Sequence, residues 1–216
     1  AMDAGTGTNV AAADITDSTD DKLTAGTTTL AMKGDSAPKA EVNNGAEAAG
    51  FARFNFSSAS ARDSIVYACE RAGMRNEFDK PGAIPTASMT EWSDFMVANG
   101  IKQGLSLMSD VEMSWFPEPG LLAAGLLPSY SHVVTSVPGA GKEIIAKLRA
   151  AEAAGEKVVV HCCAGQHRTG TTLAAWLVDR YGLSPEEAVE EILTHAAANN
   201  VRRGAEAEKV RKLLEQ

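Results

Sequence analysis

One short segment constrains the fold of this 216-residue chain more than any other. Val158-Val159-Val160 is an apolar β-branched run, which is typical of a buried strand. The loop from Cys162 to Arg168 follows it and contains Gly165, and residues 171–181 then have the pattern of a helix. A strand that leads through a tight loop into a helix forms an anion site, because unpaired N–H groups and the helix dipole meet there. The segment therefore predicts an α/β fold with an anion site at the carboxyl end of a strand.

The side chains of this loop predict a reaction as well as a binding site. The donors that hold a phosphate also stabilise a thiolate, so we expect Cys162 to be nucleophilic at neutral pH. Arg168 has a planar fork that can hold two phosphate oxygens. Thr169 has a hydroxyl that can stabilise the sulfur when it leaves. These residue types predict attack on a phosphomonoester through a phosphocysteine intermediate.

The motif His-Cys-x5-Arg-Thr-Gly, from His161 to Gly170, resembles the signature of the cysteine-dependent protein tyrosine and dual-specificity phosphatases. The resemblance covers about residues 51–216. Gly100-Ile101-Lys102 with residues 105–108 resembles a strand of compact members, and Gly182 to Ala188 resembles their G-x-S-x-E-E-A helix start. It implies a single α/β domain in which helices flank a central, mostly parallel sheet, the protein tyrosine phosphatase-like fold.

The resemblance also implies roles for the residues of the loop. His161 would order the loop from the position before the nucleophile. The residues that it implies for binding the phosphoryl group are Cys163, Ala164, Gly165, Gln166, His167 and Arg168. The His167-Arg168 pair is similar to an atypical plant and fungal group, some of whose members act on inositol pyrophosphates.

The general acid of this family does not have an obvious equivalent here. The resemblance implies an aspartate on a loop before the nucleophile, yet residues 119–142 contain no Asp or Glu, and Thr135 or Ser136 stands where the aspartate is expected. His132 is the candidate substitute, because an imidazolium can donate a proton near neutral pH. The alternative is that His132 is an ordinary surface or partly packed histidine.

Three carboxylates further upstream are also possible proton donors: Asp110, Glu112 and Glu118. Each has the alternative interpretation of a solvated loop or helix end. The missing acid leaves two functions open, which are phosphomonoester hydrolysis on a phosphoprotein or an inositol phosphate, and a pseudophosphatase that binds phosphorylated partners. Sulfur or arsenate chemistry of the rhodanese kind is the least favoured, because the loops of such enzymes are shorter and lack the Arg-Thr-Gly ending.

Composition limits the partners and cofactors. The formal net charge of −8 argues against a nucleic-acid surface or a polybasic membrane site. No run of 18 apolar residues occurs, so we expect no membrane span. The four histidines lack the spacing of metal ligands, and we expect no metal and no cofactor.

Residues 1–50 differ in composition from the rest of the chain. They are rich in Ala, Thr, Gly and Asp and contain no aromatic residue. This composition predicts a low-complexity arm or a disordered segment. The catalytic domain is expected over residues 51–216.

The chain has three cysteines, Cys69, Cys162 and Cys163, and this odd number without a pairing pattern predicts a reducing, cytoplasmic compartment. Cys163 is expected to be a small packing residue. The alternative is that Cys163 or Cys69 traps an oxidised Cys162 as a disulfide. Arg202 and Arg203 face either the pocket or the solvent.

The remaining pattern alternates strands and helices, which predicts a mostly parallel sheet with helices on its faces. Strands are expected at 64–69, at 101–108, from Val133 onward, and at 158–160 in the centre of the sheet. Helices are expected at 90–99 with Thr90 as N-cap, at 142–154, from Pro185 behind a Ser184 capping box, and around 210–214.

Overall fold

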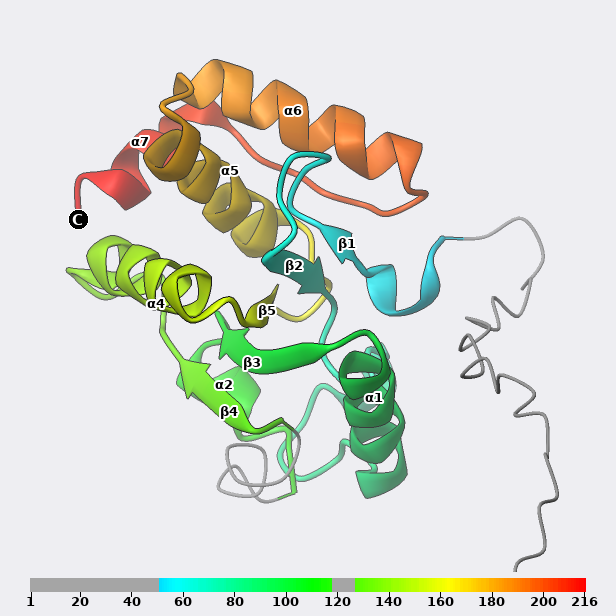
Figure 1. Ribbon diagram of the computed structural model, residues 1–216. Coiled ribbons are helices and arrows are strands. Elements are labelled where there is room, and N and C mark those ends of the chain that lie inside the picture. The colour runs from blue at the N-terminus through cyan, green and yellow to red at the C-terminus, as the bar shows by residue number, and fades with distance from the viewer. Residues whose placement is uncertain (1–50, 118–126) are drawn as a thin grey trace, which may run out of the picture. The chain divides into compact units, whose positions relative to one another are not determined.

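The computed structural model describes residues 51–117 and 127–216, so the arm predicted over residues 1–50 lies outside the described residues. It contains a five-stranded sheet in the order β1-β2-β5-β3-β4 (Figure 1). The strands are β1 Ser57–Ser58, β2 Val66–Cys69, β3 Ile101–Ser106, β4 Ser129–His132 and β5 Lys157–His161. All neighbouring pairs are parallel except β1 with β2. The predicted α/β domain with a central β5 is therefore confirmed.

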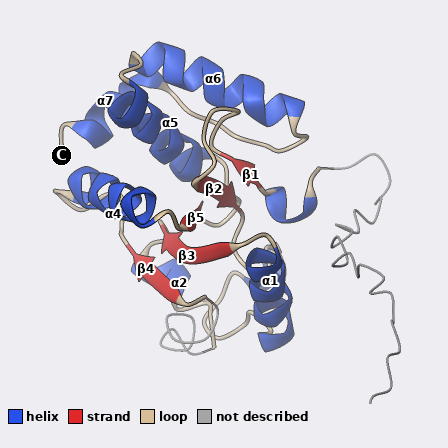
Figure 2. Ribbon diagram, in the orientation of Figure 1, coloured by secondary structure: helices blue, strands red, loops and turns tan. Residues whose placement is uncertain are grey.

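Helices cover both faces of this sheet. The 3-10 helices are η1 Arg53–Asn55 and η2 Asn76–Phe78, and the α-helices are α1 Thr86–Ala98, α2 Asp110–Met113, α4 Ala140–Ala154, α5 His167–Tyr181, α6 Pro185–Ala198 and α7 Ala207–Leu214. Figure 2 shows α4, α5, α6 and α7 on one side of the sheet and α1 on the other. Within the described residues, no helix has the length and apolar character needed to cross a bilayer.

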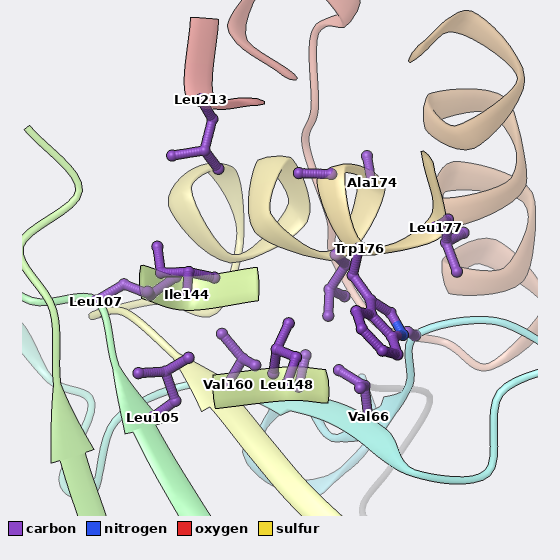
Figure 3. Close-up of a cluster of buried hydrophobic side chains, with 14 of the residues drawn as sticks. Val66, Leu105, Leu107, Ile144, Leu148, Val160, Ala174, Trp176, Leu177 and Leu213 are labelled. Carbon is purple, nitrogen blue, oxygen red and sulfur yellow. The ribbon is translucent and has the colours of Figure 1, made fainter. Parts of the chain in front are cut away.

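The larger hydrophobic core joins the sheet to α4 and α5 (Figure 3). Val66 and Val160 contribute from the strands, and Ile144 comes from α4. Trp176 of α5 is fully buried, and its Nε1 donates to Asp63 Oδ2 at 2.5 Å. Asp63 Oδ1 also accepts the amides that open β2, so one buried carboxylate fixes α5 against the start of that strand.

Several of the expected element boundaries were wrong. The strand expected at 64–69 begins at Val66, and the strand expected at 101–108 ends at Ser106. The first helix begins at Thr86, so Thr90 is not its N-cap but lies inside it and donates its hydroxyl to the Thr86 carbonyl. The third strand is β4, and Val133 follows its end. β4 is an edge strand of mostly polar residues, which an apolar pattern does not detect. The helix after the nucleophile begins at His167, before the expected residue 171.

Other boundaries were confirmed. The capping box at Ser184 precedes α6, with Glu187 as its third residue. Gly155 ends α4 in a left-handed conformation with φ of 66°.

Gly141 in the first turn of α4 is packed directly against α7. A Cβ at this position would lie 1.7 Å from the Leu213 carbonyl oxygen. We expect Gly141→Ala to force the helices apart and to cost about 1–3 kcal/mol, of which the higher helix propensity of alanine offsets up to about 1 kcal/mol. Thermal unfolding followed by circular dichroism measures this loss. Lys142→Ala, at an exposed position in the same turn, is the control, and equal Tm values for the two variants would contradict the tight contact.

Candidate active site

The predicted nucleophile lies where the sheet places it best for binding a ligand. β5 lies between β2 and β3 and ends at His161, so the loop that starts at Cys162 emerges between the carboxyl ends of three parallel strands. Ligands of open parallel sheets bind beyond this edge. Cys162 itself is buried.

The carbonyl groups of the loop all have partners outside the pocket. Two of them accept from backbone amides: the Cys163 carbonyl accepts from the Arg71 amide at 2.9 Å, and the Gln166 carbonyl accepts from the Gly170 amide at 2.6 Å. The other three accept from side chains. His161 Nδ1 donates to the Cys162 carbonyl, Asn55 Nδ2 donates to the Ala164 carbonyl at 3.0 Å, and Arg203 Nη1 donates to the Gly165 carbonyl at 2.9 Å. Because these bonds turn the carbonyls outward, the loop is set to present its N–H groups inward.

The N–H groups of residues 163–166 donate to no protein acceptor in the part of the chain that the structure describes. No side chain there caps the N-terminus of α5 either. Gly165 has φ of 63°, and a Cβ on it would lie 2.2 Å from the Cys69 carbonyl oxygen, so the loop needs glycine at this position. Unpaired amides at a helix N-terminus form a cradle for an anion.

Thr169 lies in the first turn of α5, next to the nucleophile. Its Oγ1 donates to Cys162 Sγ at 3.2 Å, and the side chain is fully buried. A hydroxyl at this distance can stabilise a sulfur that carries negative charge. This distance agrees with the predicted role of Thr169, which is to stabilise the Cys162 sulfur when it leaves. Activity measurements can test that role.

Arg168 is held by a carboxylate that the sequence patterns did not connect to it. Arg168 Nη1 donates to Glu112 Oε2 at 2.5 Å and to the Leu107 carbonyl at 3.1 Å, and Nη2 donates to Glu112 Oε1 at 2.7 Å. Glu112 thus binds the end of the guanidinium through both of its carboxylate oxygens. The edge formed by Nε and Nη2 has only a weak contact, from Nη2 to Cys163 Sγ at 3.6 Å. The ion pair therefore orients Arg168 and leaves this edge without a strong partner among the described residues.

Glu112 is therefore neither a solvated helix end nor a suitable proton donor. Burial raises its pKa, but hydrogen bonds from Arg168, from the Cys163 thiol and from the Ser109 amide lower it more, to about 2. Glu112 and Ser109 form a capping box that fixes α2. Because the folded pKa is depressed, the ion pair is present at neutral pH and is lost only as the pH falls toward 2.

His161 is buried and neutral. Burial lowers its pKa to about 4. Its Nδ1 donates to the Cys162 carbonyl at 3.1 Å, and its Nε2 accepts from the Tyr130 hydroxyl at 2.5 Å. Tyr130 thereby fixes the tautomer that orders the start of the loop.

The possible general acids lie in different environments. His132 ends β4, is partly buried, and donates from Nε2 to the Met108 carbonyl at 2.6 Å. Its Nδ1 is the nitrogen left for a proton transfer. Asp110 is exposed at the first position of α2. Glu118 lies outside the described residues.

The two other cysteines are poor nucleophiles in this arrangement. Burial and the neighbouring Glu112 raise the pKa of Cys163 to about 12, and its thiol donates to Glu112 Oε1 at 3.0 Å. Cys163 is thus a hydrogen-bonding partner and not only a packing residue. Cys69 is buried at the end of β2, which raises its pKa. Both thiols remain protonated at neutral pH.

Asn55 and Arg203 support the loop, and of the two only Arg203 was a candidate from the sequence. Asn55, with φ of 53°, donates to the Ala164 and Arg202 carbonyls and accepts the Arg202 amide at 2.7 Å. Arg203 donates to the carbonyls of Asn55, Ala68 and Gly165. Arg202, by contrast, is exposed and lies over the Phe51 ring. Of the two arginines left open by the sequence, only Arg203 faces the loop.

His167 is exposed and lies beside the segment that follows α6. A Cβ on Gly204 would lie 2.8 Å from the His167 ring, so the ring packs over this glycine. Glu206 lies within its electrostatic range. This placement gives no support to a direct contact between the imidazole and a second phosphate.

Comparison with known proteins agrees with this geometry. Residues 87–211, more than half of the chain, match the family described as dual specificity phosphatase, catalytic domain. A segment of 41 residues is 49% identical to phosphatidylglycerophosphatase and protein-tyrosine phosphatase 1 of Mus musculus. This match spans 19% of the chain and only 21% of that relative.

Solved structures show the same fold at low sequence identity. PTPMT1 in complex with PI(5)P has a TM-score of 0.53 at 17% identity, over 74% of this chain and 92% of that one. The kinase associated phosphatase KAP has a TM-score of 0.53 at 16% identity, over 69% and 84%. The nucleophile loop, the parallel sheet around it and the match over residues 87–211 lead to one conclusion: the chain belongs to the dual specificity phosphatase family of cysteine-dependent phosphatases.

Proposed function

We propose that the chain hydrolyses phosphomonoesters through a phosphocysteine at Cys162. The thiolate attacks phosphorus, so that an S–P bond forms while the P–O bond to the leaving group breaks and the leaving oxygen takes a proton. Water then attacks the phosphocysteine, which releases inorganic phosphate and returns the thiolate.

The outward orientation of the loop carbonyls is the observation that carries this proposal. The amides of residues 163–166 have no protein acceptor in the described chain, and Arg168 keeps one edge of its fork for a second pair of bonds. Such donors can stabilise the negative charge that develops on a phosphoryl group during transfer to Cys162. Thr169 then assists departure of the thiolate in the second step.

Trapping the intermediate tests this mechanism directly. Acid quenching during turnover of p-nitrophenyl phosphate, followed by mass spectrometry, should find a phosphoryl group on the peptide that contains Cys162. The Cys162→Ser variant is the control for unspecific labelling. Turnover without any label on this peptide would contradict the phosphocysteine route.

His132 is the proposed proton donor to the leaving group. Residues 119–141 contain two ionisable side chains, Tyr130 and His132, and Tyr130 is committed to His161. His132 does not stand where the aspartate is expected, because Thr135 or Ser136 occupies that position. We therefore expect the enzyme to depend strongly on a good leaving group.

The His132→Gln variant tests this role. Its rate on phenyl phosphate should fall about tenfold more than its rate on p-nitrophenyl phosphate, because only the poorer leaving group needs the proton. Steady-state kinetics with the two esters measures the difference. An equal loss of rate on the two esters would show that His132 does not donate the proton, and water would then be the proposed donor.

Phosphoproteins and inositol phosphates are the proposed substrates. The names of the similar proteins include a protein tyrosine phosphatase and a phosphatidylglycerophosphatase, and PTPMT1 was solved with PI(5)P. A comparison of kcat/KM on a phosphotyrosine peptide, on a phosphoserine peptide and on PI(5)P separates these classes. A rate on PI(5)P no higher than the rate without enzyme would remove this phosphoinositide from the proposed substrates.

Binding without turnover is the second candidate function. It is favoured by the absence of Asp and Glu from residues 119–142. Tungstate binding by the folded protein, together with no phosphocysteine and no hydrolysis of p-nitrophenyl phosphate, would select this alternative.

A further inference from the structure

Three buried or partly buried arginines lie near the nucleophile loop, and they differ in how their charge is balanced. Arg168 pairs with Glu112, and Arg71 pairs with Asp79. Arg203 has no carboxylate partner within hydrogen-bonding distance among the described residues. A buried cation without a counter-charge is costly to maintain.

The acceptors of Arg203 are all neutral groups. Nη1 donates to the Gly165 carbonyl at 2.9 Å and to the Arg202 carbonyl at 2.9 Å. Nη2 donates to the Asn55 carbonyl at 2.7 Å and to the Ala68 carbonyl at 3.0 Å, and it lies 3.5 Å from Ser57 Oγ. Burial lowers the pKa of Arg203 to about 10, so the side chain is still charged at neutral pH.

Arg203 and Arg168 contact the two strands on either side of β5, which are β2 and β3. Arg168 is anchored at the end of β3 through the Leu107 carbonyl, and Arg203 is anchored at β2 through the Ala68 carbonyl. Cys162 lies within electrostatic range of both arginines, and a thiolate there acts to raise the pKa of each. The two guanidinium groups thus place positive charge on both sides of the loop that begins at Cys162.

The other charged and titratable groups around Cys162 and Arg203 do not substitute for this charge. They are Cys69 and Glu70 from the end of β2, His161 from β5, Cys163 from the loop, and Glu112 from α2. His161 is neutral, and Cys69 and Cys163 are protonated. Burial raises the pKa of Glu70, whose field reaches Arg203 without a hydrogen bond. Glu112 pairs directly with Arg168, whereas Arg203 has no hydrogen-bonded carboxylate among the described residues and meets Glu70 only through space.

We propose that Arg203 is a positioning residue for the nucleophile: its partly buried guanidinium supplies the positive charge that keeps Cys162 as a thiolate and holds the Gly165 carbonyl out of the anion cradle. This inference rests on the proposed function and extends it to a residue that does not touch the substrate. The positive charge of Arg203 also stabilises the substrate dianion when the dianion binds in the anion cradle.

The pH profile of Cys162 alkylation is the test. Iodoacetamide labelling, read by mass spectrometry on the Cys162 peptide, gives a midpoint for thiolate formation in the full chain. The wild type should have a midpoint well below that of a free cysteine, about 8.5. Arg203→Gln keeps hydrogen-bond donors but removes the charge, and its midpoint should rise by about one pH unit or more. Arg203→Lys keeps the charge and should stay closer to the wild type.

A matched control and a second pair of variants separate charge from structural support. Arg202→Gln makes the same change at the exposed neighbouring position and should leave the midpoint unchanged. Ser57→Asp places a carboxylate beside Arg203 Nη2, whereas Ser57→Asn has nearly the same shape without the charge. Of these two variants, only Ser57→Asp should raise the midpoint of Cys162 alkylation. If Arg203→Gln does not fold, this pair still tests whether the charge of Arg203 acts on Cys162.

The outcomes distinguish the two proposals. If the wild type has a low midpoint and turns over p-nitrophenyl phosphate, while Arg203→Gln or Ser57→Asp keeps that midpoint in a folded protein, the role of Arg203 is overturned and the proposed function stands. Equal shifts in Arg203→Gln and Arg203→Lys would reduce Arg203 to a structural support. An ordinary thiol midpoint in a wild type without turnover would overturn both.

Discussion

Replacing Cys162 by serine should lower the hydrolysis of p-nitrophenyl phosphate by at least about 10⁴-fold. Serine has nearly the same shape, but its hydroxyl does not ionise at neutral pH. Among the described residues, no side chain within hydrogen-bonding distance of this position is a base. The Thr169 hydroxyl and the Arg168 edge stabilise a negative charge that already exists and cannot create one. Initial rates between pH 5 and pH 8 measure the loss.

The same variant should still bind an oxyanion. The cradle is made of backbone amides whose orientation depends on outward carbonyl bonds and not on the Cys162 sulfur. We expect tungstate to bind Cys162→Ser at least as well as the wild type, because no thiolate competes for the same donors. Isothermal titration calorimetry on both proteins provides the comparison.

Cys163→Ser is the matched comparison for this experiment. It makes the same atomic change one residue later, and a serine hydroxyl can still donate to Glu112 Oε1 in place of the thiol. Its activity should fall by less than about tenfold, because Cys163 stays protonated and its thiol contacts only Glu112 and, weakly, Arg168 among the hydrogen bonds of the described residues. Similar losses in the two variants would show that the loop, and not the nucleophile, was damaged.

The nucleophile loop was predictable because its determinants are adjacent in sequence. The run 158–160 forms the buried strand, and Gly165 permits the left-handed turn. Thr169 and Arg168 follow on the first turn of α5, so the spacing alone places them near Cys162. The capping box at Ser184 is similarly local, and it too was found where the pattern predicted it.

The support of the loop was not predictable, because its partners come from distant parts of the chain. Asn55 reaches Ala164, and Arg203 reaches Ala68, across more than 100 residues in each case. Glu112 looked like any acidic residue at a helix start until the fold brought α2 against Arg168. Only the pairing of β5 with both β2 and β3 creates these contacts, and no local pattern encodes that arrangement.

Arg168→Lys should lower kcat/KM on p-nitrophenyl phosphate by about 10²–10³-fold although it keeps the charge. A guanidinium presents one pair of N–H groups to Glu112 and a separate edge to a phosphate, and the structure shows the first pair in place. A lysine ammonium has a single charged centre, and Glu112, whose pKa is lowered to about 2, is an ionised competitor for it throughout the working pH range. The ammonium is then drawn toward the carboxylate and away from the phosphoryl group.

Glu112→Gln in the same Arg168→Lys background shows whether this competition is the cause. Removing the carboxylate should free the ammonium and recover part of the lost kcat/KM, by about tenfold. In the wild-type background the same Glu112→Gln change should lower activity, because it weakens the ion pair that orients the Arg168 guanidinium. The two effects of one substitution thus have opposite signs. A double-mutant cycle in kcat/KM measures them, and additive losses would mean that Glu112 and Arg168 contribute independently.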